Sequence, residues 1–434
     1  MAFTFKGGLH PQENKITAKC PIEKMPEPDR VAIAMSQHIG VPAIPTVQKG
    51  DRVYKGQCIG KNDAGLSCPV HASVSGTVVS VEDRINPMGQ KTQYVIIEND
   101  YTGELSPDIK RPFDLPLSDV SVEEFVECVK NAGISGMGGA TFPTHFKIAG
   151  AVGKAEKLII NCCECEPYIT ANHRLMLEKA EEIVAGAVIL MKFLNIKACD
   201  IAIEDNKKDA IKKMTKVASE FPEIRVCTMK TKYPQGDERQ IIYAIDKIEI
   251  PGGRLPIEFG RIVINTETIA AIYRAVTVGM PLIERVVTVT GNIANPKNLL
   301  VPLGTSIKDI EAYCGGTVGE IGKIITGGPM MGQAVWDEDT AVTKGTSSLI
   351  FLPKDKKKPQ NEACIHCGKC IGTCPMHLMP CYLAAFAKID DIDSLKEFDV
   401  MSCVECGCCT YQCPGNVPIV QYIRAAKGKV KKSM

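Results

Sequence analysis

The pattern of hydrophobic and polar positions changes character along the chain, and each change suggests a separate domain. Between residues 41 and 100, short runs of Val, Ile and Thr alternate with glycine turns, which predicts a small all-β sandwich. From residue 121 onward, apolar strands alternate with amphipathic helices, and this indicates a mainly parallel sheet covered by helices. Residues 1–30 show little periodicity and predict an extended lead-in.

Individual elements of the α/β region can be predicted from the same pattern. Ser121 precedes the periodic stretch VEEFVECVKNAG and is an expected helix N-cap, with Glu124 at the capping-box position. The pattern then predicts strands at 157–161, 199–203 and 224–229, and helices at 173–194, at 207–219 and from Arg239.

The last part of the chain divides into two further regions. Residues 283–340 follow the order strand, short helix, strand and resemble a soluble ligand-binding β-grasp module. A charged, proline-flanked segment at 353–363 predicts a linker. The cysteine-rich remainder carries Leu, Phe and Ile at helical spacing, which favours a helical fold over β-hairpins.

Composition narrows the class of protein. The chain has 434 residues, a net charge of +1 and a single Trp, so nothing points to nucleic acid as a partner. Its longest apolar run, Ile183 to Met191, is far shorter than the roughly 20 residues of a membrane-spanning helix. The first ten residues hold no apolar signal core. These features predict a cytosolic or membrane-peripheral protein.

Twenty cysteines are the unusual feature of the composition, and eight of them form a repeated pattern. The spacing C-x2-C-x2-C-x3-C followed by Pro occurs twice, which is the bacterial ferredoxin spacing for two [4Fe–4S] clusters. In that arrangement the fourth cysteine of each run binds the other cluster. The expected ligand sets are Cys364, Cys367, Cys370 and Cys413 for one cluster, and Cys403, Cys406, Cys409 and Cys374 for the other.

Alternatives to these cofactors are weaker. Zinc prefers four thiolates in two separated pairs, which runs of four cysteines ending in Cys-Pro fit badly. Cys408 has no counterpart in the first run and is expected to be a filler thiol near a cluster. The thiols of NCCECEP (161–167) are adjacent and cannot easily point at one ion.

In the N-terminal sandwich, which resembles a biotinyl/lipoyl domain, Lys61 is not at a recognisable hairpin tip, so a structural role is favoured over a carrier role.

A glycine-rich loop, GMGGATFPTHFK, spans Gly136 to Lys147. Glycines let backbone N–H groups approach an anion closely, and Lys147 adds a positive charge. A helix C-cap followed by a turn would use the same residues. The loop is not a dinucleotide-binding G-x-G-x-x-G motif, and taken alone it indicates little.

Three further segments place polar residues where strands are predicted to end, and ligands of parallel α/β sheets bind at the carboxyl ends of strands. The segment VINTETIA lies at a predicted strand-to-helix junction, where N–H groups can hold a phosphate. The residues concerned are Asn161, Glu164 and Glu166 in INCCECEPY, Tyr233, Gly236 and Glu238 in YPQGDERQ, and Asn265 and Thr268 in VINTETIA.

These four segments, in this order, resemble the flavin- and NADH-binding subunit of respiratory complex I. The loop is similar to that family's G-R-G-G-A-G-F-P-T, with Met137 in place of Arg and Thr141 in place of Gly. NCCECEP is similar to N-A-D-E-S-E-P, YPQGDE falls at an aromatic followed by G-E-E, and INTET falls at N-N-V-E-T. The resemblance implies that FMN contacts Gly136, Gly138, Gly139, Lys147, Asn161, Glu164, Tyr233, Asn265 and Thr268, that NADH contacts Phe142, Glu166 and Glu238, and that Gly236 belongs to the same cofactor-binding set.

The whole chain resembles the C subunit of the Rnf complex, a membrane-bound ferredoxin:NAD+ oxidoreductase. Phrases such as TFKGGLHP, VHASVSG, ECEPYITANHRLM, ITGGPMMG and ECGCCTYQCP carry the resemblance, although INTET departs from the expected Q-N-V-G-T. Two families share this architecture, a cobalamin reductase and an electron-transfer protein of amino-acid reductases. A soluble flavin/iron–sulfur protein serving one of those systems is therefore the alternative.

The resemblance implies a multidomain α/β and α+β protein. Its expected parts are an N-terminal β barrel-sandwich (1–105), an FMN/NADH-binding α/β domain (120–280), a β-grasp domain (283–340) and a helical two-cluster ferredoxin domain (360–425). It further implies electron transfer between NAD(H), FMN and two [4Fe–4S] clusters, with ferredoxin as an indirect partner. The other subunits of a membrane electron-transport complex would hold the chain peripherally on the cytoplasmic side of the cell membrane.

Overall fold

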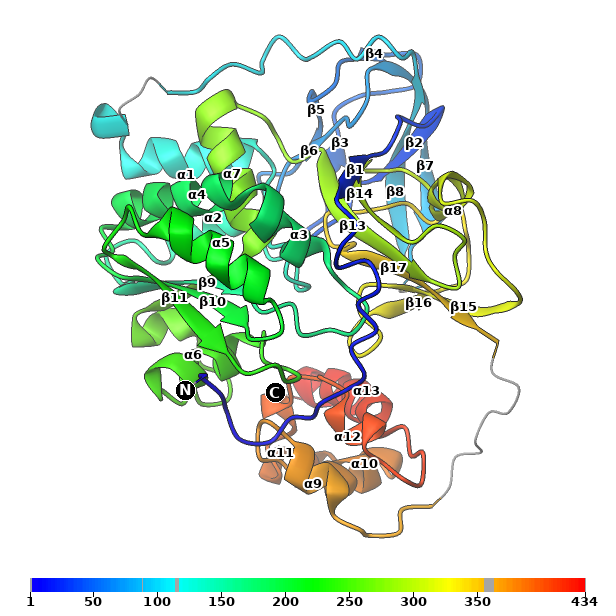
Figure 1. The fold of residues 1–434 in the computed structure, drawn as a ribbon. Helices are drawn as coiled ribbons and strands as arrows, with labels where there is room; N and C mark the ends of the chain where they lie inside the picture. Colours follow the sequence, from blue (N-terminus) through cyan, green and yellow to red (C-terminus); the bar gives the residue numbers. More distant parts are fainter. Residues whose placement is uncertain (1, 88, 114–116, 355–362, 434) are drawn as a thin grey trace.

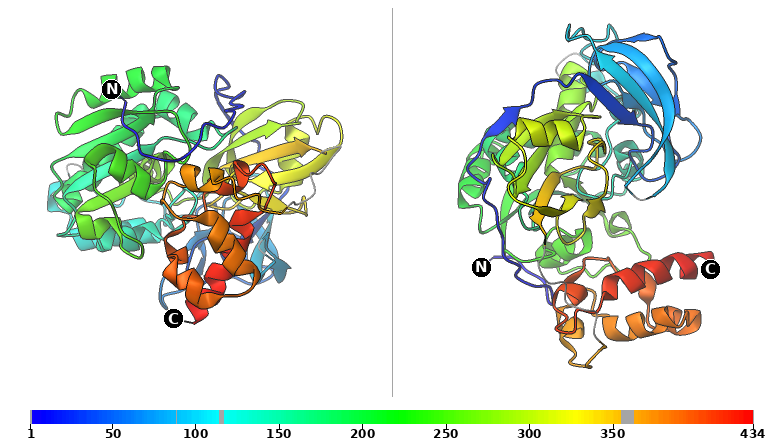
Figure 2. Two further views of the ribbon diagram at one scale, coloured as in Figure 1. Left: turned by 90° about the horizontal axis from the view of Figure 1, so that it is seen from below. Right: turned by 90° about the vertical axis from the view of Figure 1, so that its right-hand side faces the viewer.

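A computed structural model describes residues 2–87, 89–113, 117–354 and 363–433. The chain forms a β-rich N-terminal domain, an α/β domain, a second β-rich domain and a cysteine-rich helical region (Figure 1). The helical region lies at one end of the molecule, beneath the α/β domain and the second β-rich domain (Figures 1 and 2). The multidomain architecture expected from the hydrophobic pattern is confirmed for the first three parts, and the fourth is helical as expected.

The α/β domain contains a four-stranded parallel sheet in the order β11-β10-β9-β12. Every residue of β10 and most residues of β9 are buried, as expected for a sheet covered on both faces. The chain adds β10 and β11 on one side of β9 and then adds β12 on the other side. The direction of winding therefore reverses, and β9 and β12 flank the point of reversal in the sheet. The strands are β9 (Lys157–Cys162), β10 (Cys199–Glu204), β11 (Ile224–Met229) and β12 (Arg261–Asn265).

The helices of this domain agree with the predicted periodicity except at one place. Ser121 and Glu124 form both hydrogen bonds of the predicted capping box. The single helix expected at 173–194 is two helices, since the backbone of Lys179 is not helical and interrupts a continuous apolar pattern. The elements are η1 (Leu117–Asp119), α1 (Val122–Asn131), α2 (Thr144–Ala149), α3 (Ala171–Glu178), α4 (Ala180–Leu194), α5 (Lys208–Ala218), α6 (Glu238–Asp246), η2 (Pro256–Phe259) and α7 (Thr266–Val278).

The N-terminal β domain is a sandwich of a four-stranded and a three-stranded sheet. Alternate side chains such as Val31, Ile33 and Ile97 are fully buried between the sheets, as the alternating sequence predicted. Its strands are β2 (Arg30–Ala34), β3 (Ile44–Pro45), β4 (Arg52–Val53), β5 (Cys58–Lys61), β6 (Val70–His71), β7 (Gly76–Ile85) and β8 (Lys91–Asn99).

The second β-rich domain is a six-stranded mixed sheet in the order β1-β14-β13-β17-β15-β16. Two of its strands come from outside residues 283–340. The first, β1, belongs to the N-terminal lead-in and pairs parallel with β14, and β17 pairs with both β13 and β15. Its elements are β1 (Ile22–Lys24), β13 (Glu284–Gly291), β14 (Lys297–Pro302), α8 (Ile307–Tyr313), β15 (Ile321–Thr326), β16 (Gln333–Val335) and β17 (Ser348–Pro353).

The cysteine-rich region is a small helical bundle with a core that includes Leu383, Val400, Ile423 and Val430. Most of the linker expected at 353–363, and the first three residues of the expected domain 360–425, lie outside the described residues. The elements are α9 (Lys369–Thr373), α10 (Pro380–Lys388), α11 (Ile392–Glu397), η3 (Val400–Ser402), α12 (Cys408–Tyr411) and α13 (Ile419–Lys432).

The N-terminal lead-in runs across the molecule and contacts three of its parts (Figure 1). Phe3 pairs with Met229 at the edge of the parallel sheet, and the amide of Gly8 donates a 2.8 Å hydrogen bond to the carbonyl of Thr373 in the helical region. The chain then reaches β1 in the second β-rich domain. The lead-in therefore ties the helical region to the rest of the chain.

Candidate functional site

A crevice is expected where the winding of the parallel sheet reverses, because ligands of such sheets bind outside the carboxyl ends of the strands at that point. β9 and β12 flank the reversal, and Asn161 and Asn265 are paired at their carboxyl ends. The hydroxyl of Thr266 donates to the carbonyl of Asn161 and joins the two strand ends. Two residues that lie far apart in the sequence thus meet at the predicted binding position.

The glycine-rich loop packs against the start of α7 beside these asparagines. The amide of Met137 donates to the hydroxyl of Thr268 (2.9 Å), and a Cβ on Gly138 would lie 3.3 Å from the Cβ of Asn265. Asn265 itself caps α7 by accepting from the amides of Glu267 and Thr268. At Gly139, φ is +117° and no atom lies within 4 Å of the position a Cβ would take. The loop backbone is therefore open to a ligand that approaches closely.

Asn161 connects the crevice with the segment that follows β11. Its amide nitrogen donates to the carbonyl of Gly236 (2.7 Å), and the amide of Gly236 donates to the Sγ of Cys165. A Cβ on Gly236 would lie 3.5 Å from Asn161. The structure therefore brings together Gly138, Asn161, Gly236, Asn265 and Thr268.

Lys147, expected at FMN, and Glu238, expected at NADH, form an ion pair. The ammonium of Lys147, on α2, lies 2.5 Å from the carboxylate of Glu238, the first residue of α6. Both side chains are about one-third exposed. Phe142 follows the loop and is 37% exposed, and its carbonyl accepts from the amide of Gly136. The Phe142 ring is accordingly accessible from solvent.

The two acids of NCCECEP are engaged elsewhere. The carboxylate of Glu164 accepts from the amides of Asn172 and His173 in the first turn of α3. The carboxylate of Glu166 accepts from the amides of Met330 and Met331 in the second β-rich domain. Burial raises the pKa of Glu166 to about 7.

Tyr233, which the resemblance assigns to the flavin, contacts the helical region. Its hydroxyl donates a 2.7 Å hydrogen bond to the carbonyl of Cys406, and its side chain is only 1% exposed. It packs with Leu9, Cys406 and Cys408. A buried phenol needs an acceptor, and the cysteine loop supplies one.

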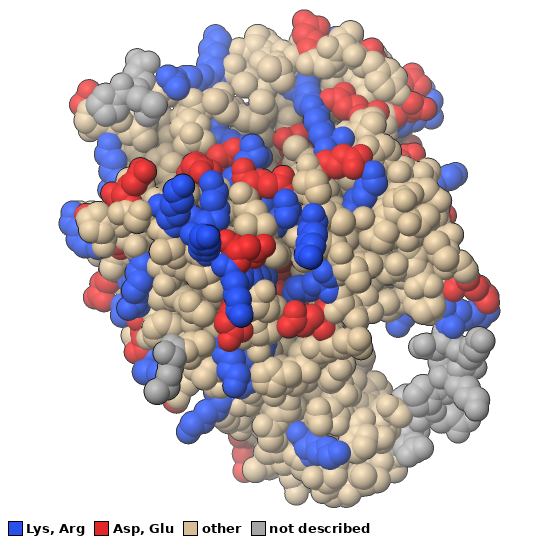
Figure 3. All heavy atoms as spheres, in the orientation of Figure 1, with Lys and Arg blue, Asp and Glu red and all other residues tan. Residues whose placement is uncertain are grey.

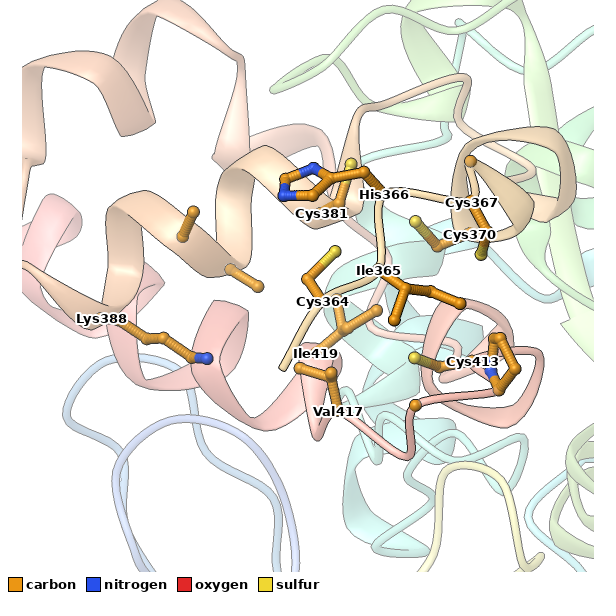
Figure 4. A pocket seen from close by; sticks show the side chains of 15 residues that line it. Cys364, Ile365, His366, Cys367, Cys370, Cys381, Lys388, Cys413, Val417 and Ile419 are labelled. Carbon is orange, nitrogen blue, oxygen red and sulfur yellow. The ribbon is translucent and has the colours of Figure 1, made fainter. Parts of the chain in front are cut away.

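The eight patterned cysteines line two cavities in the helical region. The thiols of Cys364, Cys367, Cys370 and Cys413 surround the first cavity (Figure 4). Cys374, Cys403, Cys406 and Cys409 line the second. These are the two sets that the ferredoxin spacing predicts, in which each run contributes its last cysteine to the other group.

One further cysteine lines each cavity. Cys381, on α10, lies at the first, and Cys408 lies at the second and is fully buried. Within the described ranges, no three His, Cys, Asp or Glu side chains come close enough together to hold a single metal ion.

The two cavities differ in their surroundings. The second touches the α/β domain, since Tyr233 binds Cys406 and the side-chain amide of Gln240 donates to the carbonyl of Pro375. The first is lined entirely by residues of the helical region, and Cys364 and Cys367 are exposed. The second cavity is therefore the inner one and the first is the outer one.

Models of three known protein families match the chain. The Nuo51 FMN-binding domain matches residues 129–274, the RnfC barrel sandwich hybrid domain matches residues 3–102, and the SLBB domain matches residues 286–334. The FMN-binding match includes the glycine loop and both asparagines of the crevice.

Curated relatives extend the similarity over nearly the whole chain. The C subunit of the proton-translocating ferredoxin:NAD(+) oxidoreductase complex of Clostridium ljungdahlii is 45% identical, over 99% of this chain and 94% of that protein. The Na(+)-translocating counterpart of Acetobacterium woodii is 42% identical, over 98% of this chain and 97% of that protein.

The chain belongs to the RnfC family, the C subunits of the Rnf complex.

Membership confirms the resemblance drawn from the sequence and favours it over the two soluble families with the same architecture. A third RnfC relative, from the ion-translocating oxidoreductase complex of Rhodobacter capsulatus, is 38% identical over 99% of this chain and 84% of that protein. A solved NAD+-reducing [NiFe]-hydrogenase chain superposes with a TM-score of 0.50 over 73% of this chain and 63% of its own length. At 16% identity that likeness shows the fold alone.

One half-buried residue near this site was missed in the sequence analysis. Lys15, from the lead-in, donates to the carbonyls of Glu164, Glu166 and Ile169 and so fixes the course of the NCCECEP loop. No periodicity or spacing marks Lys15 as part of this site. Asp237, beside Glu238 in YPQGDERQ, caps α6, and burial raises its pKa to about 6.

Proposed function

We propose that this chain is the NADH- and FMN-binding subunit of a membrane-bound, ion-translocating ferredoxin:NAD+ oxidoreductase, and that it moves electrons between NAD(H), FMN and two [4Fe–4S] clusters. The observation that carries the proposal is a single segment that reaches both sites. The segment after β11 contributes Gly236 to the crevice and Tyr233 to the loop of the inner cavity.

The carboxyl ends of β9 and β12, where a crevice is expected, carry groups that suit FMN. Gly139 presents open backbone, Gly138 packs closely on Asn265, and the polar residues Asn161 and Thr268 lie beside them. An amide-rich loop beside the first turn of a helix suits a phosphate. The side chains of Glu164 and Tyr233, which the resemblance assigned to the flavin, are held by α3 and by the helical region. The proposed flavin set is therefore Gly136, Gly138, Gly139, Lys147, Asn161, Gly236, Asn265 and Thr268.

NADH is assigned to the open side of the same crevice. The exposed ring of Phe142 is available for stacking, and Glu238, on α6, is paired with Lys147. A bound flavin supplies the chemistry that divides the electron pair of a hydride into single electrons. The side chains of this chain bind and orient the nucleotide, and none is needed as a general acid or base.

Each cavity of the helical region suits one [4Fe–4S] cluster. Four thiolates are the donor set of such a cluster, and each cavity offers four from the ferredoxin pattern. Because the inner cavity touches the α/β domain, Cys374, Cys403, Cys406 and Cys409 would bind the cluster that exchanges electrons with the flavin side. The outer cavity would bind the cluster that exchanges electrons with a partner protein.

The helical region exposes several large apolar side chains. The lower part of the face in Figure 3, which the helical region forms, carries few charges compared with the charged band above it. Ile365 lines the outer cavity, and the other exposed apolar side chains of this region are Met379, Tyr382, Ile389, Met401 and Tyr411. Exposed apolar side chains of this kind favour contact with another protein of the complex.

The chain would be held on the cytoplasmic face of the cell membrane by partner subunits. No helix in the described part of the chain is long and apolar enough to cross a bilayer. The four lysines Lys427, Lys429, Lys431 and Lys432 are only a weak electrostatic anchor. Washing membranes with high salt should therefore leave the chain bound, and deletion of the integral-membrane subunits should release it. Release by salt alone would contradict this arrangement.

Cofactor analysis of anaerobically purified protein tests the proposal. It should contain one FMN and about eight iron and eight sulfide atoms per chain, as two four-iron clusters require. Stoichiometric zinc without iron would overturn the cluster assignment, and absence of flavin would overturn the crevice assignment.

Cysteine variants provide a matched control within one cavity. Cys413→Ser should lose about four iron atoms, whereas Cys381→Ser, which alters a thiol of the same cavity outside the ferredoxin pattern, should keep them. Equal iron loss in both variants would show that the cavity, and not the spacing, determines cluster binding.

A further inference from the structure

Glu166, in the α/β domain, binds a loop of the second β-rich domain that also touches the helical region. Its two carboxylate oxygens accept hydrogen bonds from the amides of Met330 (3.0 Å) and Met331 (2.9 Å). A Cβ on Gly328 would lie only 2.2 Å from the carboxyl carbon of Glu166, so the loop packs directly on this group. We name residues 327–332 the methionine loop.

The methionine loop also lies against the inner cysteine cavity. A Cβ on Gly407 would lie 3.1 Å from the carbonyl oxygen of Met330, and Met330 packs with the cluster formed by Leu9, Tyr233, Cys406 and Cys408. The methionine loop is thus held between Glu166 on one side and residues 406–408 on the other.

The Glu166 carboxylate is fixed by its surroundings and is not free to bind a nucleotide. Both of its oxygens are used by backbone amides of another domain. The backbone behind it is also fixed, because the ammonium of Lys15 donates to the carbonyls of Glu164, Glu166 and Ile169 at 2.6–3.0 Å. The contact with NADH expected from the resemblance therefore does not fit this side chain.

We propose that Glu166 is a positioning residue: it clamps the methionine loop onto the inner cysteine loop and thereby sets the rate of electron transfer between the flavin site and the inner cluster. This inference rests on the proposed function, because it needs both cofactors. Above its pKa of about 7 the Glu166 side chain is a charged carboxylate, and a charge-assisted hydrogen bond is stronger than a neutral one, which suits a clamp between domains. Losing the charge should loosen the contact between the α/β domain and the helical region without changing the crevice.

Rapid kinetics of the purified holoprotein tests the proposal with Glu166→Gln. NADH should bleach the flavin at the wild-type rate and with the wild-type KM, while reduction of the clusters becomes slower by about 10-fold, equivalent to about 1.4 kcal/mol. A higher KM for NADH with unchanged cluster reduction would overturn the proposal and restore Glu166 as a nucleotide ligand.

Gly328→Ala approaches the same contact from the other domain, since its new methyl group displaces the Glu166 carboxylate. It should give the same slow cluster reduction, and combination with Glu166→Gln should add little more, because both changes break one contact. Met331→Ala is the matched control: its side chain is 46% exposed, and it retains the amide that Glu166 binds. Additive effects of the first two variants would contradict a shared clamp.

Hydrogen exchange gives a readout that does not depend on bound cofactors. In the wild-type chain and in Met331→Ala, the amides of Met330 and Met331 should be protected, and in Glu166→Gln they should exchange faster by about 10-fold. Unchanged protection in Glu166→Gln would refute the clamp even if iron and flavin are bound. If the purified chain holds no cofactors but Glu166→Gln still loses protection of these amides, the proposed function is refuted and the clamp is supported.

Discussion

Glu267→Gln is a sensitive test of how the second β-rich domain supports the flavin crevice. Glu267 lies in the first turn of α7, between the proposed flavin ligands Asn265 and Thr268. Its carboxylate accepts from the guanidinium of Arg285 (2.7 Å) and from the amide of Val286 (2.7 Å), both on β13. The Arg285 and Glu267 side chains are only 2% and 9% exposed, so the pair is buried between the two domains.

The expected loss in the free energy of unfolding follows from the burial of this ion pair. Removing one partner of a buried ion pair costs about 3–5 kcal/mol, because the other charge remains in a low-dielectric site without compensation. The side-chain amide introduced by the substitution would keep one acceptor for the Val286 amide, so the lower end, about 3 kcal/mol, is expected. Glu320→Gln is the control: its partner Lys354 is 62% exposed, and pairs of that kind contribute about 0–1 kcal/mol.

Local unfolding should be measured by hydrogen exchange of α7 and β13, since a multidomain chain need not unfold in a single step. Urea denaturation of the apoprotein would complement it, with the midpoint lowered and the slope unchanged. Flavin content should also fall, because Asn265 and Thr268 lie at the start of α7, which the substitution loosens. If Glu267→Gln costs no more than Glu320→Gln, the reasoning from burial and pairing is refuted.

Three further outcomes are expected. Tyr233→Phe removes the donor to the buried carbonyl of Cys406 and should lower the free energy of unfolding of the helical region by about 1–3 kcal/mol, seen as a lower urea midpoint. Asn265→Ala removes the cap of α7, should cost about 1 kcal/mol, and should weaken flavin retention during gel filtration. Burial raises the pKa of Glu166 from 4.5 to about 7, so between these pH values the folded chain holds a proton that the unfolded chain releases. The free energy of unfolding should therefore fall as pH rises from 4.5 to about 7. Glu166→Gln should flatten this pH dependence.

Several features of this protein are determined by local sequence. Cysteine spacing predicts both groups of four thiols, because three of the four ligands that wrap one cluster must lie within a few residues of each other. Strand and helix positions of the α/β domain follow from apolar periodicity, which each element must satisfy to bury one face. The capping box at Ser121 is likewise a contact over three residues.

Only the tertiary structure decided which distant residues meet. The pairing of Asn161 with Asn265 depends on β12 adding beside β9, and strand order leaves no periodic trace in the sequence. The same holds for Tyr233, whose acceptor is 173 residues away, and for Glu166, whose partners lie in another domain. Such contacts are fixed by how the domains pack against one another. A motif can therefore show that a residue lies near a site, but it does not show which partner the side chain contacts there.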